Sequence, residues 1–275
     1  MMFLLVGGLL VAGSWFLAWV QIPPLAVYYF PPLWVGYILF INGICEVFFR
    51  DSLIRKMGWS FLLLFILSIP LWWFFEYLNT IVENWYYVFP EEWSQTEQII
   101  LKTISFSTVI PAVCSSAFFI YQLLRNRLQS WSVRVSLNPT AVLVSGLAAF
   151  ALMFLYPKVF FPFMWVAPLF VLDSLNDRLG PPSILRELRE GRWLVVVAFS
   201  FGVLLTGFFW EMWNFYAFPK WFYTIPLFDF LRIFEMPVLG YGGYVPFGLF
   251  VLVFISTAFA LMRKLGVRVS LPRFD

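Results

Sequence analysis

Long apolar stretches separated by short polar connections form the main pattern of this chain. A transmembrane helix needs about 20 mostly apolar residues, and this template fits eight stretches. They are 2–20, 32–49, 58–78, 104–124, 139–156, 161–177, 193–215 and 236–262. The pattern therefore predicts an all-α fold, a polytopic integral membrane bundle of about eight transmembrane helices. The short second and sixth stretches carry polar groups near one end, so we expect them to be tilted, kinked or only partly inserted.

The chain also contains an internal repeat. Matching positions are Phe30-Pro31 and Trp34 with Phe161-Pro162 and Trp165, Glu76 and Asn79 with Glu211 and Asn214, and Trp85-Tyr86-Tyr87 with Trp221-Phe222-Tyr223. These matches predict a four-helix repeat over 1–125, a cytoplasmic linker at 126–138 and a second four-helix repeat over 139–275. Because each copy has an even number of spans, the two share one orientation. We expect an axis along the membrane normal to relate them.

Composition and charge agree with a membrane protein and indicate its orientation. Hydrophobic residues make up 62% of the chain and charged residues 12%, about half the charged fraction of a soluble domain. Most of the 18 Lys and Arg residues lie in 50–57, 125–138, 178–192 and 263–275. The positive-inside rule then places both termini in the cytoplasm, in an inner or plasma membrane. The net charge of +3 is an orientation signal, and we expect no nucleic-acid partner.

Two residue counts limit the chemistry. The chain has no histidine, and its two cysteines stand alone in apolar runs. Histidine-ligated metals, haem and histidine general bases are therefore excluded. The cysteines lack the spacing of a metal or redox pair. We expect neither a metal site nor a cofactor.

An acid and an amide stand three residues apart near the end of the third and seventh spans. Glu76 and Asn79, like Glu211 and Asn214, share one helix face. Ionisable groups in a membrane are functional candidates. One interpretation is a pair of facing carboxylates in a shared outward cavity, acting as proton donors or cation ligands. The other is a polar clamp between the repeats.

A second set of polar residues lies near the cytoplasmic ends of the second and sixth spans. Asn42 and Glu46, like Asp173 and Asp177, are four residues apart and share a face. Arginines close enough to pair with them are Arg50, Arg55, Arg178 and Arg186. We interpret this set as a salt-bridged boundary in preference to a site.

The second repeat contains more candidate chemistry than the first. An acid stands before the final span only there, as Glu235, and the glycine-rich opening at 240–243 permits close approach. The candidate catalytic residues are Glu211, Asn214 and Glu235, with Glu76 and Asn79 in support. Aromatic faces stabilise cations by about 0.5 to 2 kcal/mol each. The candidate substrate-binding residues are therefore Trp210, Trp213, Trp221, Tyr223, Tyr241 and Tyr244.

These motifs resemble the lycopene cyclase domain of small membrane-embedded carotenoid cyclases, which also have two homologous halves. The matching positions are Glu76 and Glu211 for an acid, Trp85/Tyr87 and Trp221/Tyr223 for Trp-x-Tyr, and Glu235-Met236-Pro237 for a Pro-x-Glu-Glu motif. The chain differs in placing Glu before Pro, in lacking the second Glu and in having four spans in each half. The resemblance implies a carotenoid-like substrate and acid-catalysed cyclisation or isomerisation.

Three functions remain open from the sequence. The first is an intramembrane enzyme that protonates a double bond of a long apolar lipid, isoprenoid or carotenoid-like, without a cofactor. The second is a transporter or lipid carrier with its site between the repeats. The third is a structural subunit of a membrane complex. A homo-oligomer or another membrane partner is compatible with each of them.

Overall fold

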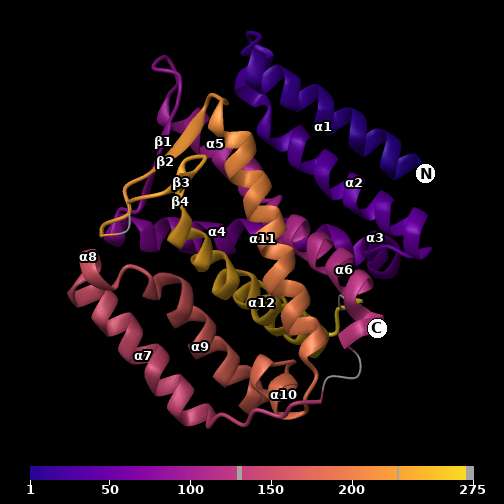
Figure 1. Cartoon of the computed structure of the whole chain (residues 1–275), viewed down its shortest axis with the longest axis vertical. Helices are drawn as coiled ribbons and strands as arrows, with labels where there is room; N and C mark the ends of the chain where they lie inside the picture. The colour runs from indigo at the N-terminus through magenta and orange to yellow at the C-terminus, as the bar shows by residue number, and fades with distance from the viewer. Residues whose placement is uncertain (129–131, 228, 271–275) are drawn as a thin grey trace.

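The computed structural model describes residues 1–128, 132–227 and 229–270 and is mainly helical (Figure 1). Its first part contains α1 (Met2–Val20), η1 (Leu25–Tyr28), α2 (Phe30–Phe49), α3 (Leu53–Met57), η2 (Gly58–Phe61), α4 (Leu62–Val82), β1 (Trp85–Val88), α5 (Gln95–Phe106) and α6 (Val109–Leu128). Its second part contains α7 (Pro139–Leu155), α8 (Pro157–Phe160), α9 (Phe163–Leu179), α10 (Ile184–Arg189), α11 (Trp193–Phe215), β2 (Lys220–Tyr223), β3 (Arg232–Ile233), β4 (Met236–Pro237), η3 (Val238–Gly243) and α12 (Tyr244–Lys264). Residues 129–131 of the predicted linker and 271–275 of the second predicted repeat lie outside the described residues.

The predicted class, a helical membrane bundle, is confirmed by the length and composition of the helices. Within the described residues, six helical segments are long and apolar enough to cross a membrane, namely Met2–Val20, Phe30–Phe49, Leu53–Val82, Gln95–Leu128, Trp193–Phe215 and Val238–Lys264. Helices α7 and α9, with 17 residues each, are shorter. The count of eight spans, the cytoplasmic termini and the layout of the repeats stay predictions.

Two predicted helix boundaries are wrong. The stretch 104–124 is not one helix, because α5 ends at Phe106 and α6 begins at Val109. The last long helix begins at Tyr244, several residues after the predicted start. Pro237 has no backbone N–H to give to a helix. The 3-10 segment Val238–Gly243 follows it. This segment contains the glycine-rich opening at 240–243, in which three of the four residues are glycine. The last long helix therefore begins only after the glycine-rich opening.

The fold is not purely helical, because short strands join the two halves. β1 and β2 form an antiparallel pair in which Trp85 faces Tyr223 and Tyr87 faces Trp221. The central residues of the two strands, Tyr86 and Phe222, stack with their ring centroids 5.7 Å apart. β3 and β4 form a second, two-residue pair. Aromatic residues favour strands, and in β1 and β2 they are the repeated aromatic triplets of the sequence.

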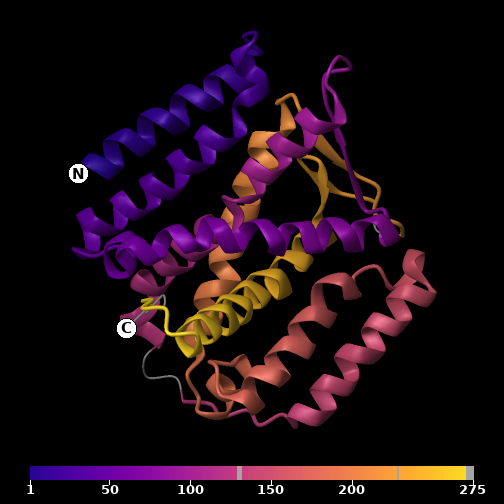
Figure 2. The same ribbon diagram turned by 180° about the vertical axis from the view of Figure 1, so that it is seen from behind.

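Helical hairpins flank a central group of helices. α1 packs on α2 at one side of the molecule and α7 on α9 at the other, and α4, α6, α11 and α12 lie between them (Figure 1). The view from behind shows the same order (Figure 2). The buried core is one cluster with side chains from both halves, from Trp34 in α2 to Phe259 in α12. The halves therefore pack as one body.

Close packing of α6 on α11 connects the halves at the centre. A Cβ atom at Gly202 would lie 2.6 Å from the Cα atom of Ala117, so the backbones meet where a side chain has no room. One turn along α11, the hydroxyl groups of Thr206 and Ser116 are 2.9 Å apart. Tyr37 of α2 reaches the same Ser116 hydroxyl at 2.7 Å. Small residues and hydroxyl bonds of this kind are typical of helix contacts in membranes.

Candidate functional site

Each predicted asparagine fixes a strand to the end of its own helix. In α11, the Asn214 amide donates to the Trp221 carbonyl at 2.8 Å and accepts from the Trp221 N–H at 3.0 Å. In α4, Asn79 makes the same two bonds with Trp85, at 2.8 and 3.2 Å. These bonds place the indole and phenol rings of both strands beside the acids of the helices. Asn79 and Asn214 therefore have a structural role that the sequence left open.

We expect Asn214→Ala to lower the free energy of unfolding by about 1 to 3 kcal/mol. The reason is that Asn214 is fully buried, and its removal leaves two backbone groups of Trp221 without these partners. Thermal unfolding of the purified protein in detergent, followed by tryptophan fluorescence, measures the change. Asn79→Ala is the matched comparison and should cost less, because Asn79 is only partly buried. Unchanged stability in Asn214→Ala would contradict this role.

Glu76 in α4 is held by three donors on one oxygen. Its Oε1 accepts from Tyr87 Oη at 2.8 Å, from Trp85 Nε1 at 2.9 Å and from Trp72 Nε1 at 3.1 Å. Three donors of this kind stabilise a carboxylate. Glu76 is therefore a hydrogen-bond acceptor that ties the end of α4 to β1.

Glu211 in α11 has a different environment. Its side chain is fully buried, and Oε1 accepts from Tyr223 Oη at 2.7 Å and from Tyr244 Oη at 2.5 Å. Its other oxygen, Oε2, is buried and has no hydrogen-bond partner among the described residues. An oxygen without a partner in a buried carboxyl group is costly for the charged form. Glu211 is thus the acid of the two whose environment suits a bound proton.

The tyrosines of the two strands keep their protons at neutral pH. Burial raises the pKa of Tyr223 well above its ordinary value. Burial and then Glu76 do the same to the pKa of Tyr87. Both phenols are therefore neutral hydrogen-bond donors. Trp221 Nε1 donates to Tyr223 Oη at 2.9 Å, which completes the chain from indole to phenol to carboxyl group.

Glu76 and Glu211 lie behind the wall of an apolar cavity of about 180 Å³. A cavity of this size accepts a small apolar group. The side chains of both halves line it, including Trp72, Trp85, Tyr87, Lys102 and Phe106 from the first and Trp165, Trp210, Lys220, Trp221, Tyr223 and Tyr244 from the second. Among the described residues, no carboxylate lines it. Glu76 and Glu211 therefore contact the cavity only indirectly, through the aromatic side chains that donate hydrogen bonds to them.

Glu235, the third predicted acid, is an ion-pair partner. Its Oε1 lies 2.6 Å from Nζ of Lys220, which also donates to the Phe215 carbonyl at 2.7 Å. The Lys220 ammonium lies over the ring of Phe222, 4.6 Å from its centroid. Glu235 thus holds Lys220 at the cavity and does not itself line it.

Trp210, Trp221, Tyr223 and Tyr244 line the cavity as a substrate-binding role requires, but Trp213 and Tyr241 do not. Trp213 packs against Trp34 of α2 at 5.2 Å and against Trp15 of α1 at 6.2 Å between ring centroids. Tyr241 donates its hydroxyl to the Ile233 carbonyl at 3.2 Å. For these two residues the structure indicates packing and loop contacts.

Trp165 is a cavity residue that the site prediction missed. It stacks on Phe75 with centroids 4.9 Å apart and on Trp85 at 5.9 Å. The repeated Phe-Pro-x-x-Trp motif contains it, so the duplication was a signal for its importance. Its counterpart Trp34 is buried in the core beside Trp210, at 5.2 Å, so the two copies of the motif differ in exposure to the cavity.

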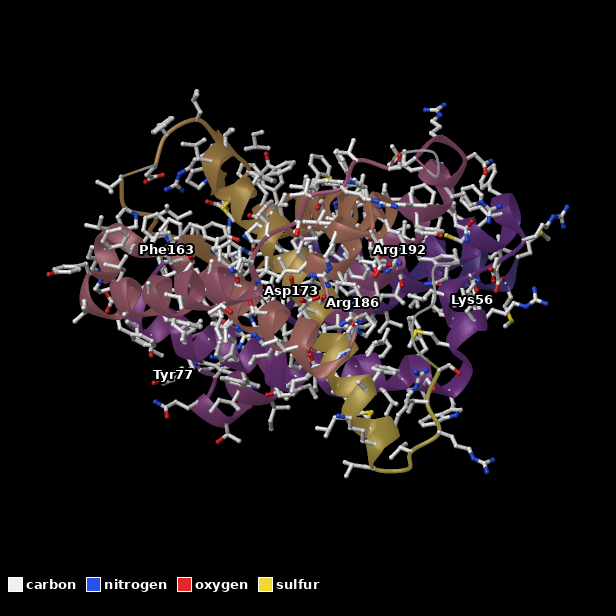
Figure 3. The ribbon with its side chains drawn as sticks, turned by 90° about the horizontal axis from the view of Figure 1, so that it is seen from below. Lys56, Tyr77, Phe163, Asp173, Arg186 and Arg192 are labelled. Atoms are coloured by element: carbon white, nitrogen blue, oxygen red, sulfur yellow. The ribbon has the colours of Figure 1, made fainter. Side chains whose placement is uncertain are left out.

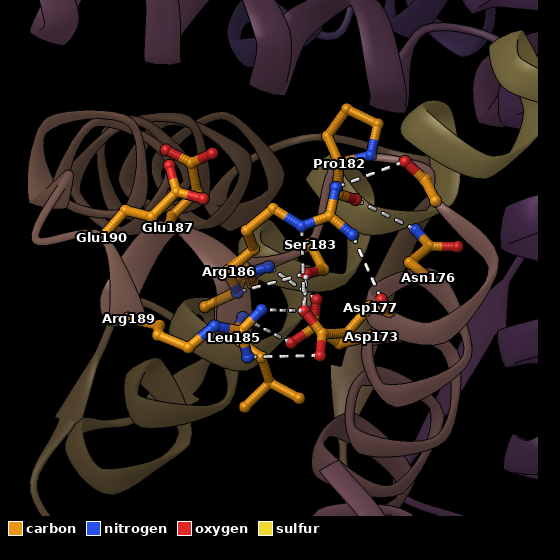
Figure 4. Close-up of polar contacts among 12 residues, drawn as sticks. Asp173, Asn176, Asp177, Pro182, Ser183, Leu185, Arg186, Glu187, Arg189 and Glu190 are labelled. Carbon is orange, nitrogen blue, oxygen red and sulfur yellow. Dashed lines mark hydrogen bonds and ion pairs between the residues drawn. The ribbon is translucent and has the colours of Figure 1, made fainter. Parts of the chain in front are cut away.

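The polar residues at the other end of the bundle form a structural boundary, as the sequence indicated. Asp173 accepts from the backbone N–H groups of Ile184 and Leu185, at 2.6 and 3.0 Å, and so caps α10 (Figure 4). Asp177 accepts from Ser183 at 3.1 Å. In the view from below, Asp173 and Arg186 lie beside each other on α9 and α10 (Figure 3).

The arginine partners of this boundary differ in part from those expected. Arg186 is 3.9 Å from Asp177, but the closest partner is Arg189, at 2.9 Å. Arg178 instead donates to the Thr140 hydroxyl at 2.6 Å. Within the described part of the chain, Arg50 and Arg55 form no ion pair. Ser52 and Glu46 repeat the Ser183 and Asp177 contact at 3.1 Å, so the duplicated residues keep the same structural role.

Comparison of the chain with protein-family models, with curated proteins and with solved structures gave no match.

Proposed function

We propose that this protein is an intramembrane enzyme that takes one segment of a long apolar lipid into the aromatic cavity and transfers protons to and from its double bonds. The observation that carries the proposal is the contact of two cavity-lining hydroxyl groups, those of Tyr223 and Tyr244, with the fully buried Glu211. An isoprenoid or carotenoid-like chain has the apolar surface that such a wall binds.

The proposed chemistry uses Glu211 as a proton store and a tyrosine as the group that touches the substrate. Protonated Glu211 passes its proton to the Tyr244 oxygen as the Tyr244 hydroxyl gives its own proton to one carbon of a double bond, so no free phenolate forms. The carbocation then loses a proton from a neighbouring carbon by the reverse path. No atom is gained or lost, so the result is an isomerisation or a cyclisation. General acids of this kind contribute about 10² to 10⁴-fold to a rate.

The aromatic wall supports the cationic intermediate of this proposal. Ring faces attract cations, and the indoles of Trp72 and Trp210 lie on the wall with their centroids 6.4 Å apart. Water exclusion by the same rings protects a carbocation from hydration. The resemblance to lycopene cyclase domains points to the same chemistry and is part of the proposal. Glu235 acts in it through Lys220, as a positioning residue.

Deuterium incorporation tests the proposed function. We expect the purified full-length protein, incubated in deuterated water with acyclic polyenes that include lycopene, to place deuterium in the product or in the recovered polyene. Each cycle of protonation and loss exchanges a hydrogen, so mass spectrometry detects even a reaction without net product. Protein-free vesicles are the control. A broad panel of polyenes without any deuterium incorporation would refute the proposal.

A further inference from the structure

The cavity has two cationic side chains in its wall, and they differ in their partners. Lys220 is neutralised by Glu235 at 2.6 Å. Lys102, on α5, makes no ion pair and no hydrogen bond within the described part of the chain. Its Nζ atom lies 5.3 Å from the ring centroid of Trp73 and 5.4 Å from that of Tyr87. Lys102 is therefore a half-buried cation held over aromatic faces.

Among the basic residues outside the four Lys- and Arg-rich segments of the sequence, Lys102 is the one without a carboxylate partner within the described part of the chain. Lys158 pairs with Glu83 at 2.7 Å, and Arg232 pairs with Asp229 at 2.6 Å. With Lys220, these are the basic residues outside the four arginine-rich and lysine-rich segments of the sequence. Each except Lys102 has a carboxylate partner. The described wall of the cavity contains no carboxylate, so its net charge is positive.

We infer that the cavity takes an amphipathic anion, with an isoprenoid chain against the aromatic wall and a phosphate group beside Lys102. This inference rests on the proposed function and narrows its substrate class. An ammonium group and a phosphate form charge-assisted hydrogen bonds, which are about twice as strong as neutral ones. A half-buried lysine without a carboxylate gains the most from such a partner, because nothing in the protein neutralises it. The ring faces of Trp73 and Tyr87 orient the ammonium without competing for its charge.

Binding measurements with matched lipids test the inference. The full-length protein in phosphatidylcholine nanodiscs is titrated with a C20 isoprenyl monophosphate, with the C20 isoprenyl alcohol and with inorganic phosphate, and quenching of tryptophan fluorescence is recorded. We expect the monophosphate to bind about tenfold or more tightly than the alcohol. In Lys102→Gln this preference should fall to about threefold or less, with the affinity for the alcohol unchanged.

Lys158→Gln is the matched control, because Lys158 has the same charge, pairs with Glu83 and does not line the cavity. It should keep the full preference for the phosphate. Equal binding of the alcohol and the monophosphate by the unaltered protein, or a preference that survives in Lys102→Gln, would overturn the anion site and leave the proposed function intact. Binding of neither lipid would overturn both. Displacement of the lipid by inorganic phosphate at equal concentration would show a free-phosphate site and overturn the lipid assignment.

Discussion

Glu211→Gln should reduce deuterium incorporation or product formation by about 10² to 10⁴-fold, the range of a lost general acid. Glutamine keeps the size of the side chain and an oxygen that accepts from Tyr223 and Tyr244. It has no proton that it can pass to the Tyr244 oxygen. The variant should therefore fold and insert normally while its activity is lost. The measurement is the initial rate under the conditions of the deuterium experiment, with size-exclusion chromatography as the check on folding.

Glu46→Gln is the control for this experiment. Glu46 accepts from Ser52 at 3.1 Å near the end of α2, where the contacts are those of a helix boundary. Its activity should stay within about threefold of the unaltered protein, because it makes no contact with the proposed proton path. Full activity in Glu211→Gln, or a larger loss in Glu46→Gln, would move the site to the other end of the bundle.

Gly202→Leu should be strongly destabilising, because it separates α6 from α11. Even a Cβ atom at this position lies 2.6 Å from the Cα atom of Ala117, and the remaining atoms of leucine have no space between the helices. Overpacking typically costs about 1 to 3 kcal/mol and sometimes more. The bonds of Thr206 and Tyr37 to Ser116 lie in the same contact, so they should weaken as well. The measurement is the thermal unfolding midpoint in detergent.

Gly13→Leu is the matched control, since Gly13 is also a glycine within a long apolar helix. It lies in α1, and a Cβ atom there meets no other atom within 4 Å. Leucine also has a higher helix propensity than glycine, so the control should unfold at the same temperature or slightly above it. Equal unfolding midpoints for Gly202→Leu and Gly13→Leu would show that the two halves do not depend on this contact.

The helices were predictable from the sequence because a membrane leaves little choice to an apolar stretch. Backbone groups in lipid must be paired within the segment, so about 20 apolar residues imply a helix. The acid and amide pairs were predictable for a different reason. Glu76 with Asn79, and Glu211 with Asn214, stand three residues apart in both copies, and their bonds to the following strand are local.

The remainder of the site depends on contacts between distant residues. The pairing of Trp85 with Tyr223 joins residues 138 positions apart in the numbering, and each strand is too short for a clear period. Trp210 and Trp213 both contact Trp34 of α2, but only Trp213 also packs against Trp15 of α1, and only Trp210 lines the cavity. The ion pair of Lys220 and Glu235 requires the loop between them to close. No local pattern contains that information.

The antiparallel ladder of β1 and β2 limits how the two halves can move. Asn79 anchors β1 to α4 and Asn214 anchors β2 to α11, so the paired strands link the ends of the two helices. A carrier that alternates by rocking one half against the other must break the β1–β2 hydrogen bonds or bend both helices. Breaking the ladder costs about 0.5 to 1.5 kcal/mol for each backbone hydrogen bond. Passage between the strands is thus opposed, and in the proposed function the lipid would enter the cavity sideways, from the bilayer.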